Sequence, residues 1–222
     1  MTPAAQAVLF DFDGVIVESG PIKTAAFREL FADRPEIQEA VVAHHRRHLG
    51  LSRYRKFEWI YRNLLGRELT PGEAQRLGRE FSRLVLDRVL ACPLVPGARE
   101  LLERLSGSIP AFVVSGTPQE ELDLIVDRRS LRPLFTEVHG SPPEKPEIVA
   151  GIVERHGLDR RRVWLVGDGL SDQAAAAEAG VRFVAREAPG EPAPAWRQPV
   201  TRIGDLAELA SRWQGSVLPA GR

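Results

Sequence analysis

Apolar residues change their spacing along the chain, and the first change comes early. Residues 6–12 form a nearly continuous apolar run, which predicts a buried β-strand. From about Pro21 to Ala91, apolar residues instead recur every three or four positions, which predicts amphipathic helices. One such face is formed by Phe57, Ile60, Tyr61, Leu64 and Leu65. Residues 18–91 are therefore expected to be an all-helical segment.

After Pro93, short apolar runs alternate with segments of helical periodicity. We expect strands at residues 111–114, 135–139, 163–166 and 181–185. We expect helices at residues 98–105, 121–126, 146–156, 171–179 and 206–213. Apolar strands that alternate with helices are typical of a parallel sheet covered on both faces. The pattern therefore predicts an α/β domain made of residues 1–17 and 92–222, with residues 18–91 inserted into it.

The composition excludes several classes of protein. In 222 residues, Lys and Arg number 30 and Asp and Glu number 30, so the basic excess of a nucleic-acid-binding protein is missing. The single cysteine, Cys92, excludes an intrachain disulfide and multi-cysteine zinc sites, and we expect it to be buried. No apolar run approaches the ~18 residues that span a bilayer, and no signal-peptide pattern is present. We therefore expect a cytoplasmic protein, a monomer or weak homodimer, without nucleic-acid or membrane partners.

Three of the expected strands run directly into polar motifs. The first strand is followed by Asp11-Phe12-Asp13-Gly14, the strand near residue 112 by Ser115-Gly116-Thr117, and the strand near residue 164 by a segment from Gly167 to Asp172. Ligands in open α/β sheets bind at the carboxyl ends of the strands. We therefore expect the motifs to converge if their strands are neighbours, with Lys145 within reach of the same place.

The residue types in these motifs indicate their chemistry. The motifs contain four aspartates: Asp11, Asp13, Asp168 and Asp172. Such carboxylates repel one another unless a cation lies among them, and hard oxygen ligands without His or Cys favour Mg²⁺ together with a substrate phosphate. Each motif alone could be an ordinary turn or helix cap. Together with the Lys145 ammonium and the Ser115 hydroxyl, the set is typical of a phosphoryl-transfer site.

The four motifs resemble those of the haloacid dehalogenase (HAD) superfamily. The matching positions are Asp-x-Asp-Gly at 11–14, Ser115 at a strand end, Lys145, and Gly-Asp-x-x-x-Asp at 167–172. The chain is most similar to the phosphoglycolate phosphatase and β-phosphoglucomutase-like branch, whose substrate-reading loop resembles residues 50–53. The resemblance implies a Rossmann-like parallel sheet core and makes residues 18–91 an all-helical cap.

The resemblance also implies a role for each motif residue. Asp11 would be the nucleophile that forms an aspartyl-phosphate, and Asp13 the general acid and base. Mg²⁺ would be held by Asp11, Asp168 and the backbone carbonyl of Asp13, with Asp172 in a supporting role. Ser115, Gly116 and Lys145 would bind the phosphate. The implied activity is Mg²⁺-dependent hydrolysis of a small phosphorylated metabolite.

Residues of the expected cap are candidates for substrate recognition. Arg53 and Lys56 lie three residues apart and share a helix face, and the resemblance makes them candidates for reading a second group of the substrate. A solvated arginine is the alternative for Arg53. Of the 30 basic residues, only Lys23, Lys56 and Lys145 are lysines, and the others are arginines. This scarcity indicates that the three positions require a compact ammonium group. The run His44-His45-Arg46-Arg47-His48 is expected to be a solvated helix face.

Alternative functions stay open at this point. Asp13 favours phosphate esters, because family members that attack carbon–halogen bonds do not need a second aspartate. A β-phosphoglucomutase-like phosphomutase is one alternative, although that enzyme carries an acidic residue where this chain has Gly167. A catalytically silent HAD-like protein that binds a ligand or a partner is the other, although the sequence lacks none of the expected catalytic residues.

Overall fold

The computed structural model describes residues 4–197 and 199–213, and within them six parallel strands form one sheet in the order β3-β2-β1-β4-β5-β6. The strands are β1 (Ala7–Phe10), β2 (Ala111–Pro118), β3 (Glu137–Ser141), β4 (Val163–Gly167), β5 (Arg182–Arg186) and β6 (Thr201–Ile203). The sequence pattern predicted all of them except β6, which is too short to show a period. The α/β fold with a parallel sheet is confirmed.

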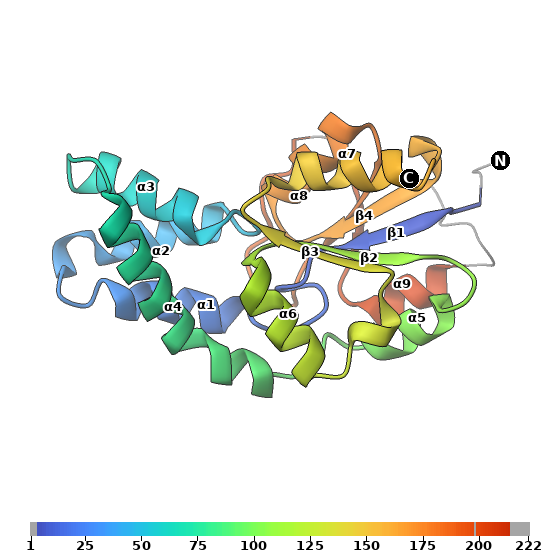
Figure 1. The fold of residues 1–222 in the computed structure, drawn as a ribbon, viewed down its shortest axis with the longest axis horizontal. Helices are drawn as coiled ribbons and strands as arrows, with labels where there is room; N and C mark the ends of the chain where they lie inside the picture. The colour runs from blue at the N-terminus through green and yellow to red at the C-terminus, as the bar shows by residue number, and fades with distance from the viewer. Residues whose placement is uncertain (1–3, 198, 214–222) are drawn as a thin grey trace.

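Side chains alternate between the two faces along each strand, so both faces of the sheet carry apolar side chains. Helices cover both of these faces. These helices are α5 (Ala98–Leu105), α6 (Gln119–Arg128), α7 (Lys145–Arg155), α8 (Leu170–Ala179) and α9 (Leu206–Arg212), with 3₁₀ turns η1 (Arg132–Leu134) and η2 (Arg160–Arg162). The helices α7 and α8 cover one face of the sheet, and α5, α6 and α9 cover the other (Figure 1). Ala7 and Leu9 belong to the apolar cluster under α7 and α8, whereas Val8 and Phe10 belong to the cluster on the opposite face.

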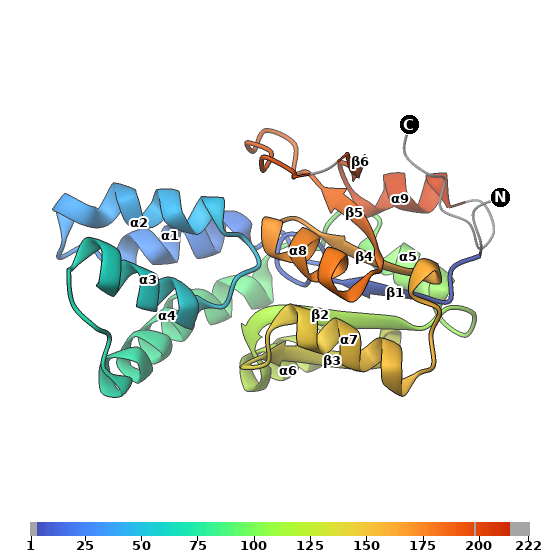
Figure 2. The ribbon, with the colours of Figure 1, turned by 90° about the horizontal axis from the view of Figure 1, so that it is seen from above.

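The first four of the five helices between β1 and β2 lie together at one end of the molecule (Figures 1 and 2). They are α1 (Gly20–Leu30), α2 (Pro35–Arg47), α3 (Arg53–Leu64) and α4 (Pro71–Ala91), and we call residues 20–91 the helical insert. The chain enters and leaves the insert side by side, since Glu18 N donates to Pro93 O at 3.0 Å. The division into two domains stays a prediction, and residues 214–222 of the expected core lie outside the described residues.

The insert has an aromatic core that packs against polar side chains. Phe27, Phe57 and Phe81 come from three different helices, and their ring centroids lie 4.8–6.3 Å apart. The expectation of a solvated face at residues 44–48 is wrong for His44 and His45, which are buried, although Arg46 and Arg47 are exposed. The histidines are covered because aromatic rings stack on them, Trp59 on His44 and Phe27 on His45.

Two further predictions concern the single cysteine and membrane-spanning helices. Cys92 is a buried free cysteine, as the sequence predicted. None of the described helices combines the length and the apolar character that a bilayer crossing requires.

Candidate active site

The central strand β1 brings the polar motifs together. Its neighbours are β2 and β4, so Phe10 pairs with Val113 on one side and with Val166 on the other. The next residue, Asp11, is fixed to β4 because its backbone N–H donates to the carbonyl of Val166 at 2.9 Å. Three motifs that are far apart in the sequence therefore end at the same edge of the sheet, where parallel α/β folds bind ligands.

Lys145 connects two of the aspartates. It begins α7, and its Nζ lies 2.9 Å from Asp11 Oδ2 and 2.5 Å from Asp172 Oδ1. All three side chains are at most 6% exposed. Burial alone would lower the pKa of Lys145, but Asp11 and Asp172 outweigh it and raise the pKa above its usual range. The ammonium therefore keeps its charge beside Asp11.

Three carboxylates form a cluster with the chemistry of a metal site. Asp11, Asp168 and Asp172 each place an oxygen within 4.8 Å of the others. Asp168 Oδ1 is buried without a hydrogen-bond donor among the described residues, and Asp11 Oδ2 faces the Lys145 ammonium. Burial, only partly offset by Lys145, raises the pKa of Asp11 to about 7, and burial with the neighbouring carboxylates raises the pKa of Asp168. A hard divalent cation such as Mg²⁺ fits this donor set, because it would relieve the repulsion.

Asp13 points away from this cluster and has its own partners. Its carboxylate accepts hydrogen bonds from Ser19 Oγ at 2.7 Å, Thr117 Oγ1 at 2.7 Å and the Lys23 ammonium. Burial acts to raise the pKa of Asp13, but Lys23 and the three hydrogen bonds outweigh it and lower the pKa to about 2. Asp13 is therefore a carboxylate in this arrangement.

Of the residues expected to bind phosphate, Ser115 and Gly116 lie at the end of β2 and Lys145 lies at the start of α7. Ser115 is buried, and its Oγ accepts the Thr117 N–H at 3.1 Å, so the hydroxyl proton stays available because the described residues offer it no acceptor. Gly116 and Thr117 line a cavity in front of Asp11 and Asp13. Ser115 and Lys145 are not among the residues that line that cavity.

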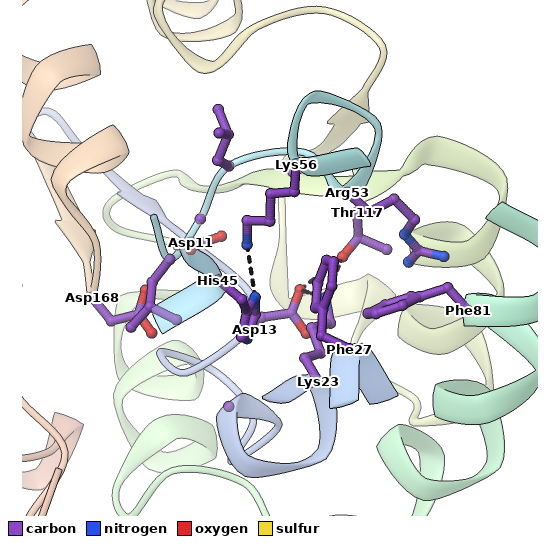
Figure 3. Close-up of a pocket in the computed structure, with 15 residues that line it drawn as sticks. Asp11, Asp13, Lys23, Phe27, His45, Arg53, Lys56, Phe81, Thr117 and Asp168 are labelled. Atoms are coloured by element: carbon purple, nitrogen blue, oxygen red, sulfur yellow. Dashed lines mark hydrogen bonds and ion pairs between the residues drawn. The ribbon is translucent and has the colours of Figure 1, made fainter. Parts of the chain in front are cut away.

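This cavity of about 50 Å³, which we call the central cavity, lies between the sheet edge and the helical insert. Figure 3 shows side chains from both parts converging on it. From the sheet side it is lined by Asp11, Asp13, Gly116, Thr117 and Asp168, and from the insert by Gly20, Lys23, Phe27, His45, Leu49, Gly50, Leu51, Arg53, Lys56 and Phe81. A larger cavity of about 610 Å³ adjoins it, since Gly20, Leu49 and Asp168 line both.

The loop at residues 49–52 covers the motif residues closely. Ser171 Oγ donates to the carbonyl of Leu49 at 2.9 Å. Gly50 has φ +75°, and a Cβ there would lie 2.8 Å from Lys145 Nζ and 2.5 Å from Ser171 Oγ. Glycine is required at this position because a side chain would be strained and would collide with the lysine. The insert is therefore closed over the site.

Two cap candidates from the sequence lie in the central cavity with different partners. Arg53 and Lys56 are 4% and 3% exposed, so both side chains lie on the buried face of their helix. The alternative that Arg53 is a solvated surface residue is therefore excluded. Arg53 Nη2 lies 2.5 Å from Glu121 Oε1, at the start of α6. Lys56 Nζ lies 3.0 Å from His45 Nδ1 (Figure 3, dashed line).

Sequence reasoning missed three residues of the site. Thr117 and Lys23 hold Asp13, and His45 contacts Lys56. The signal that was available is the scarcity of lysine, because Lys23, Lys56 and Lys145 all lie at this site. Thr117 belongs to the Ser115-Gly116-Thr117 motif, but the motif gave it no role, and no local pattern marked His45, since the partners of both residues come from distant segments.

Comparisons with known proteins agree with this geometry. Residues 5–180 match the family model described as haloacid dehalogenase-like hydrolase. The chain is 31% identical over 187 residues to a phosphoglycolate phosphatase of Synechococcus elongatus, covering 81% of this chain and 82% of the relative. It is 26% identical over 192 residues to a phosphorylated carbohydrates phosphatase of Thermotoga maritima, covering 81% and 83%.

Solved structures agree on the fold. The structure of CbbY from Rhodobacter sphaeroides in complex with phosphate superposes with a TM-score of 0.69 at 18% identity, covering 92% of this chain and 96% of that one. The family match spans most of the chain and includes all four motifs. The chain is therefore a member of the haloacid dehalogenase-like hydrolase family, as the motif resemblance predicted.

Proposed function

We propose that this chain is a Mg²⁺-dependent phosphatase that hydrolyses a small phosphorylated metabolite through an aspartyl-phosphate on Asp11. The observation that carries the proposal is the position of Asp11, a buried carboxylate at the end of β1 with the Lys145 ammonium 2.9 Å away and two further aspartates beside it. The phosphatases among its relatives support a phosphate ester as the substrate. Because the helical insert is closed over the site, the substrate is expected to be small.

In the first step, an Asp11 carboxylate oxygen forms a bond to phosphorus while the bond from phosphorus to the leaving oxygen breaks. Lys145, whose Nζ lies 2.9 Å from Asp11 Oδ2, and the buried Ser115 hydroxyl would donate to the phosphoryl oxygens and so stabilise the charge that develops. Asp13 supplies the proton that the leaving oxygen takes. Because Lys23 holds the pKa of Asp13 at about 2, this proton transfer requires the Lys23 contact to open as substrate enters.

In the second step, water attacks phosphorus and regenerates the Asp11 carboxylate. Asp13 accepts the proton of this water, and its lowered pKa and its hydrogen bonds suit the carboxylate to that role. Thr117 and Ser19 fix the orientation of the carboxylate, because each donates to it at 2.7 Å. The closed loop at residues 49–52 limits access of bulk water to the site.

Asp11, Asp168 and the backbone carbonyl of Asp13 would hold the magnesium ion, with Asp172 supporting the site. When bound, the cation would supply positive charge that offsets the repulsion between the Asp11 carboxylate and the phosphate. The buried Asp168 Oδ1, which has no hydrogen-bond partner among the described residues, supports this assignment.

Removal of divalent ions is expected to stop the reaction. Phosphate release from an aryl phosphate should fall at least ~100-fold in EDTA, because the carboxylate cluster then repels the substrate dianion. Addition of Mg²⁺ in excess should restore it. Circular dichroism in EDTA serves as the control for folding, and full activity in EDTA by a folded protein would contradict the proposal.

One observation favours a phosphatase over the phosphomutase that the sequence left open. A Cβ at Gly167 would lie 2.2 Å from Asp172 Cβ, so the acidic residue of the β-phosphoglucomutase at this position does not fit beside Asp172. We therefore expect a sugar monophosphate to give free phosphate and no isomeric sugar phosphate. Both products can be followed by ³¹P NMR.

A further inference from the structure

Arg186 is a buried arginine that belongs to none of the four motifs. It is the last residue of β5, and its side chain is 2% exposed. Its Nε donates to the carbonyl of Gly204, just after β6, at 3.0 Å, and its Nη1 donates to the carbonyl of Gly14, in the first motif, at 3.1 Å. One guanidinium therefore connects the C-terminal strands to the loop that follows β1.

The charge of Arg186 is balanced by Glu18. Nη2 and Nη1 donate to the two carboxylate oxygens at 2.6 and 3.1 Å, the forked geometry in which arginine binds carboxylates most strongly. Glu18 lies where the chain leaves the sheet for the helical insert, and its own N–H donates to the carbonyl of Pro93, where the chain returns. Arg186 therefore holds residues 13–18, which we call the first-motif loop, at both Gly14 and Glu18.

The contact between Arg186 and Gly14 crosses the end of a third strand. In the sheet, β4 lies between β1 and β5 (Figure 2), and Asp168 follows β4 directly. Gly14 has φ +76°, and a Cβ there would lie 2.1 Å from Asp168 Oδ2, so the backbone of the loop lies directly against this carboxylate. Arg186 is the donor to the Gly14 carbonyl among the described residues. It thus fixes the loop where the loop meets Asp168.

Two of the expected magnesium ligands meet at this place. The backbone carbonyl of Asp13 belongs to the peptide unit that precedes Gly14, and Asp168 lies against the same glycine. Asp168 Oδ1 is buried without a hydrogen-bond partner among the described residues, so no donor there orients it. The position of the first-motif loop relative to Asp168 therefore decides how well the two ligands suit one ion.

We propose that Arg186 is a positioning residue for the divalent cation: it fixes the first-motif loop through Gly14, so that the Asp13 carbonyl and the Asp168 carboxylate bind the same ion. This inference rests on the proposed function, which supplies the magnesium ion. Groups that orient metal ligands from outside typically change the affinity for the metal about 10- to 100-fold when they are removed. The alternative is that the pair with Glu18 only anchors the helical insert, and the two roles predict different effects on Mg²⁺ binding.

The test separates the hydrogen bond to Gly14 from the ion pair. Glu18→Gln removes the ion pair and keeps the hydrogen bond from Arg186 to Gly14. The double variant Glu18→Gln/Arg186→Met removes that hydrogen bond as well and leaves neither charge of the pair behind. Calorimetric titration of Mg²⁺ into metal-free protein gives Kd without any substrate. Kd should stay within about 3-fold of the wild-type value in Glu18→Gln and should rise at least about 10-fold in the double variant.

The activity of the same proteins gives a second readout. In the double variant, the Mg²⁺ concentration for half-maximal phosphate release should rise about 10-fold, while kcat at saturating Mg²⁺ stays within about 3-fold of Glu18→Gln. Equal Kd values in the wild type and the double variant would overturn the proposal. An equal loss of affinity in both variants would also overturn it, because the effect would then come from the ion pair.

Arg182→Met is the matched control. Arg182 lies at the other end of β5, where its guanidinium covers the ring of Trp164 at 4.9 Å. Its removal should leave the Kd for Mg²⁺ unchanged, and a loss of affinity as large as that of the double variant would contradict a specific role for Arg186.

Thermal melts in EDTA check that each variant is folded. If the double variant is not, Arg186→Lys takes its place with the same expected loss of affinity, because lysine keeps the charge beside Glu18 but lacks the planar fork that bonds Gly14 and Gly204 together. A failed phosphatase looks different: the folded wild-type protein would then bind no Mg²⁺ and release no phosphate. Tight Mg²⁺ binding that none of the Arg186 variants weakens would refute the role of Arg186 alone.

Discussion

Asp11→Asn is expected to abolish phosphate release, by on the order of 10⁴-fold or more. The amide offers no carboxylate oxygen to attack phosphorus, and it also weakens the cluster with Asp168 and Asp172. The fold should survive, since the amide has the same shape and its oxygen can still accept the Phe12 N–H that Asp11 Oδ1 accepts at 2.7 Å. Burial raises the pKa of Asp11 to about 7, so loss of the charge does not harm stability.

The measurement is phosphate release from an aryl phosphate with saturating Mg²⁺, together with a thermal melt. Asp159→Asn is the matched control, because Asp159 is a surface carboxylate that caps η2 and its amide can still cap. The control should retain wild-type activity. Undiminished turnover by a folded Asp11→Asn protein would refute the role of Asp11 as the nucleophile.

Lys145→Met is expected to lower both activity and stability. Activity should fall roughly 10³-fold, because the phosphoryl oxygens lose a donor. Removal of one partner from this buried group leaves Asp11 and Asp172 uncompensated, which should cost about 3–5 kcal/mol of unfolding free energy in metal-free protein.

The charge pairing also predicts the direction in which the stability of Lys145→Met changes with pH. The pKa of Asp11 is already raised to about 7 with Lys145 present, and loss of the ammonium raises it further. The folded variant then binds more protons than the unfolded chain above the ordinary Asp pKa of 3.8, so its stability falls as pH rises. Urea unfolding in EDTA should show a larger loss near pH 8 than near pH 5, because the Asp11 carboxyl, whose pKa is raised to about 7 or above, is neutral at the lower pH.

Arg155→Met is the matched control for this effect. Arg155 lies on the same helix, and its pair with Glu137 is exposed, so its removal should cost less than about 1 kcal/mol. An equal loss of stability in both variants, or a loss in Lys145→Met that does not grow with pH, would contradict the assigned charge pairing.

The part of the site that could be predicted from sequence is the part that strand geometry dictates. Apolar strands that run into Asp11, Ser115 and Asp168 must end at one edge of a parallel sheet, and the order β2-β1-β4 makes these strands neighbours. Lys145 follows because the helix it begins packs against α8, which begins within the fourth motif. Local pattern and one topological rule were sufficient for these positions.

The rest depends on contacts between segments that the sequence does not connect. Arg53 and Glu121 are 68 residues apart, and Lys23 and Thr117 are 94 apart. His45 was expected on a solvated face because it lies in a run of cationic residues near a helix C-terminus, where cations offset the helix dipole, yet Phe27 and Lys56 from other helices cover it. Packing of α1, α2 and α3 decides which face of each helix meets the cavity, and periodicity alone does not specify that packing.

The stereochemical course at phosphorus tests the account most directly. A phosphate ester made chiral at phosphorus with oxygen isotopes is hydrolysed in isotopically labelled water, and the configuration of the released phosphate is determined. Two successive in-line displacements, one by Asp11 and one by water, predict net retention of configuration. Inversion would mean that water attacks the ester directly, and no covalent bond to Asp11 would then lie on the reaction path.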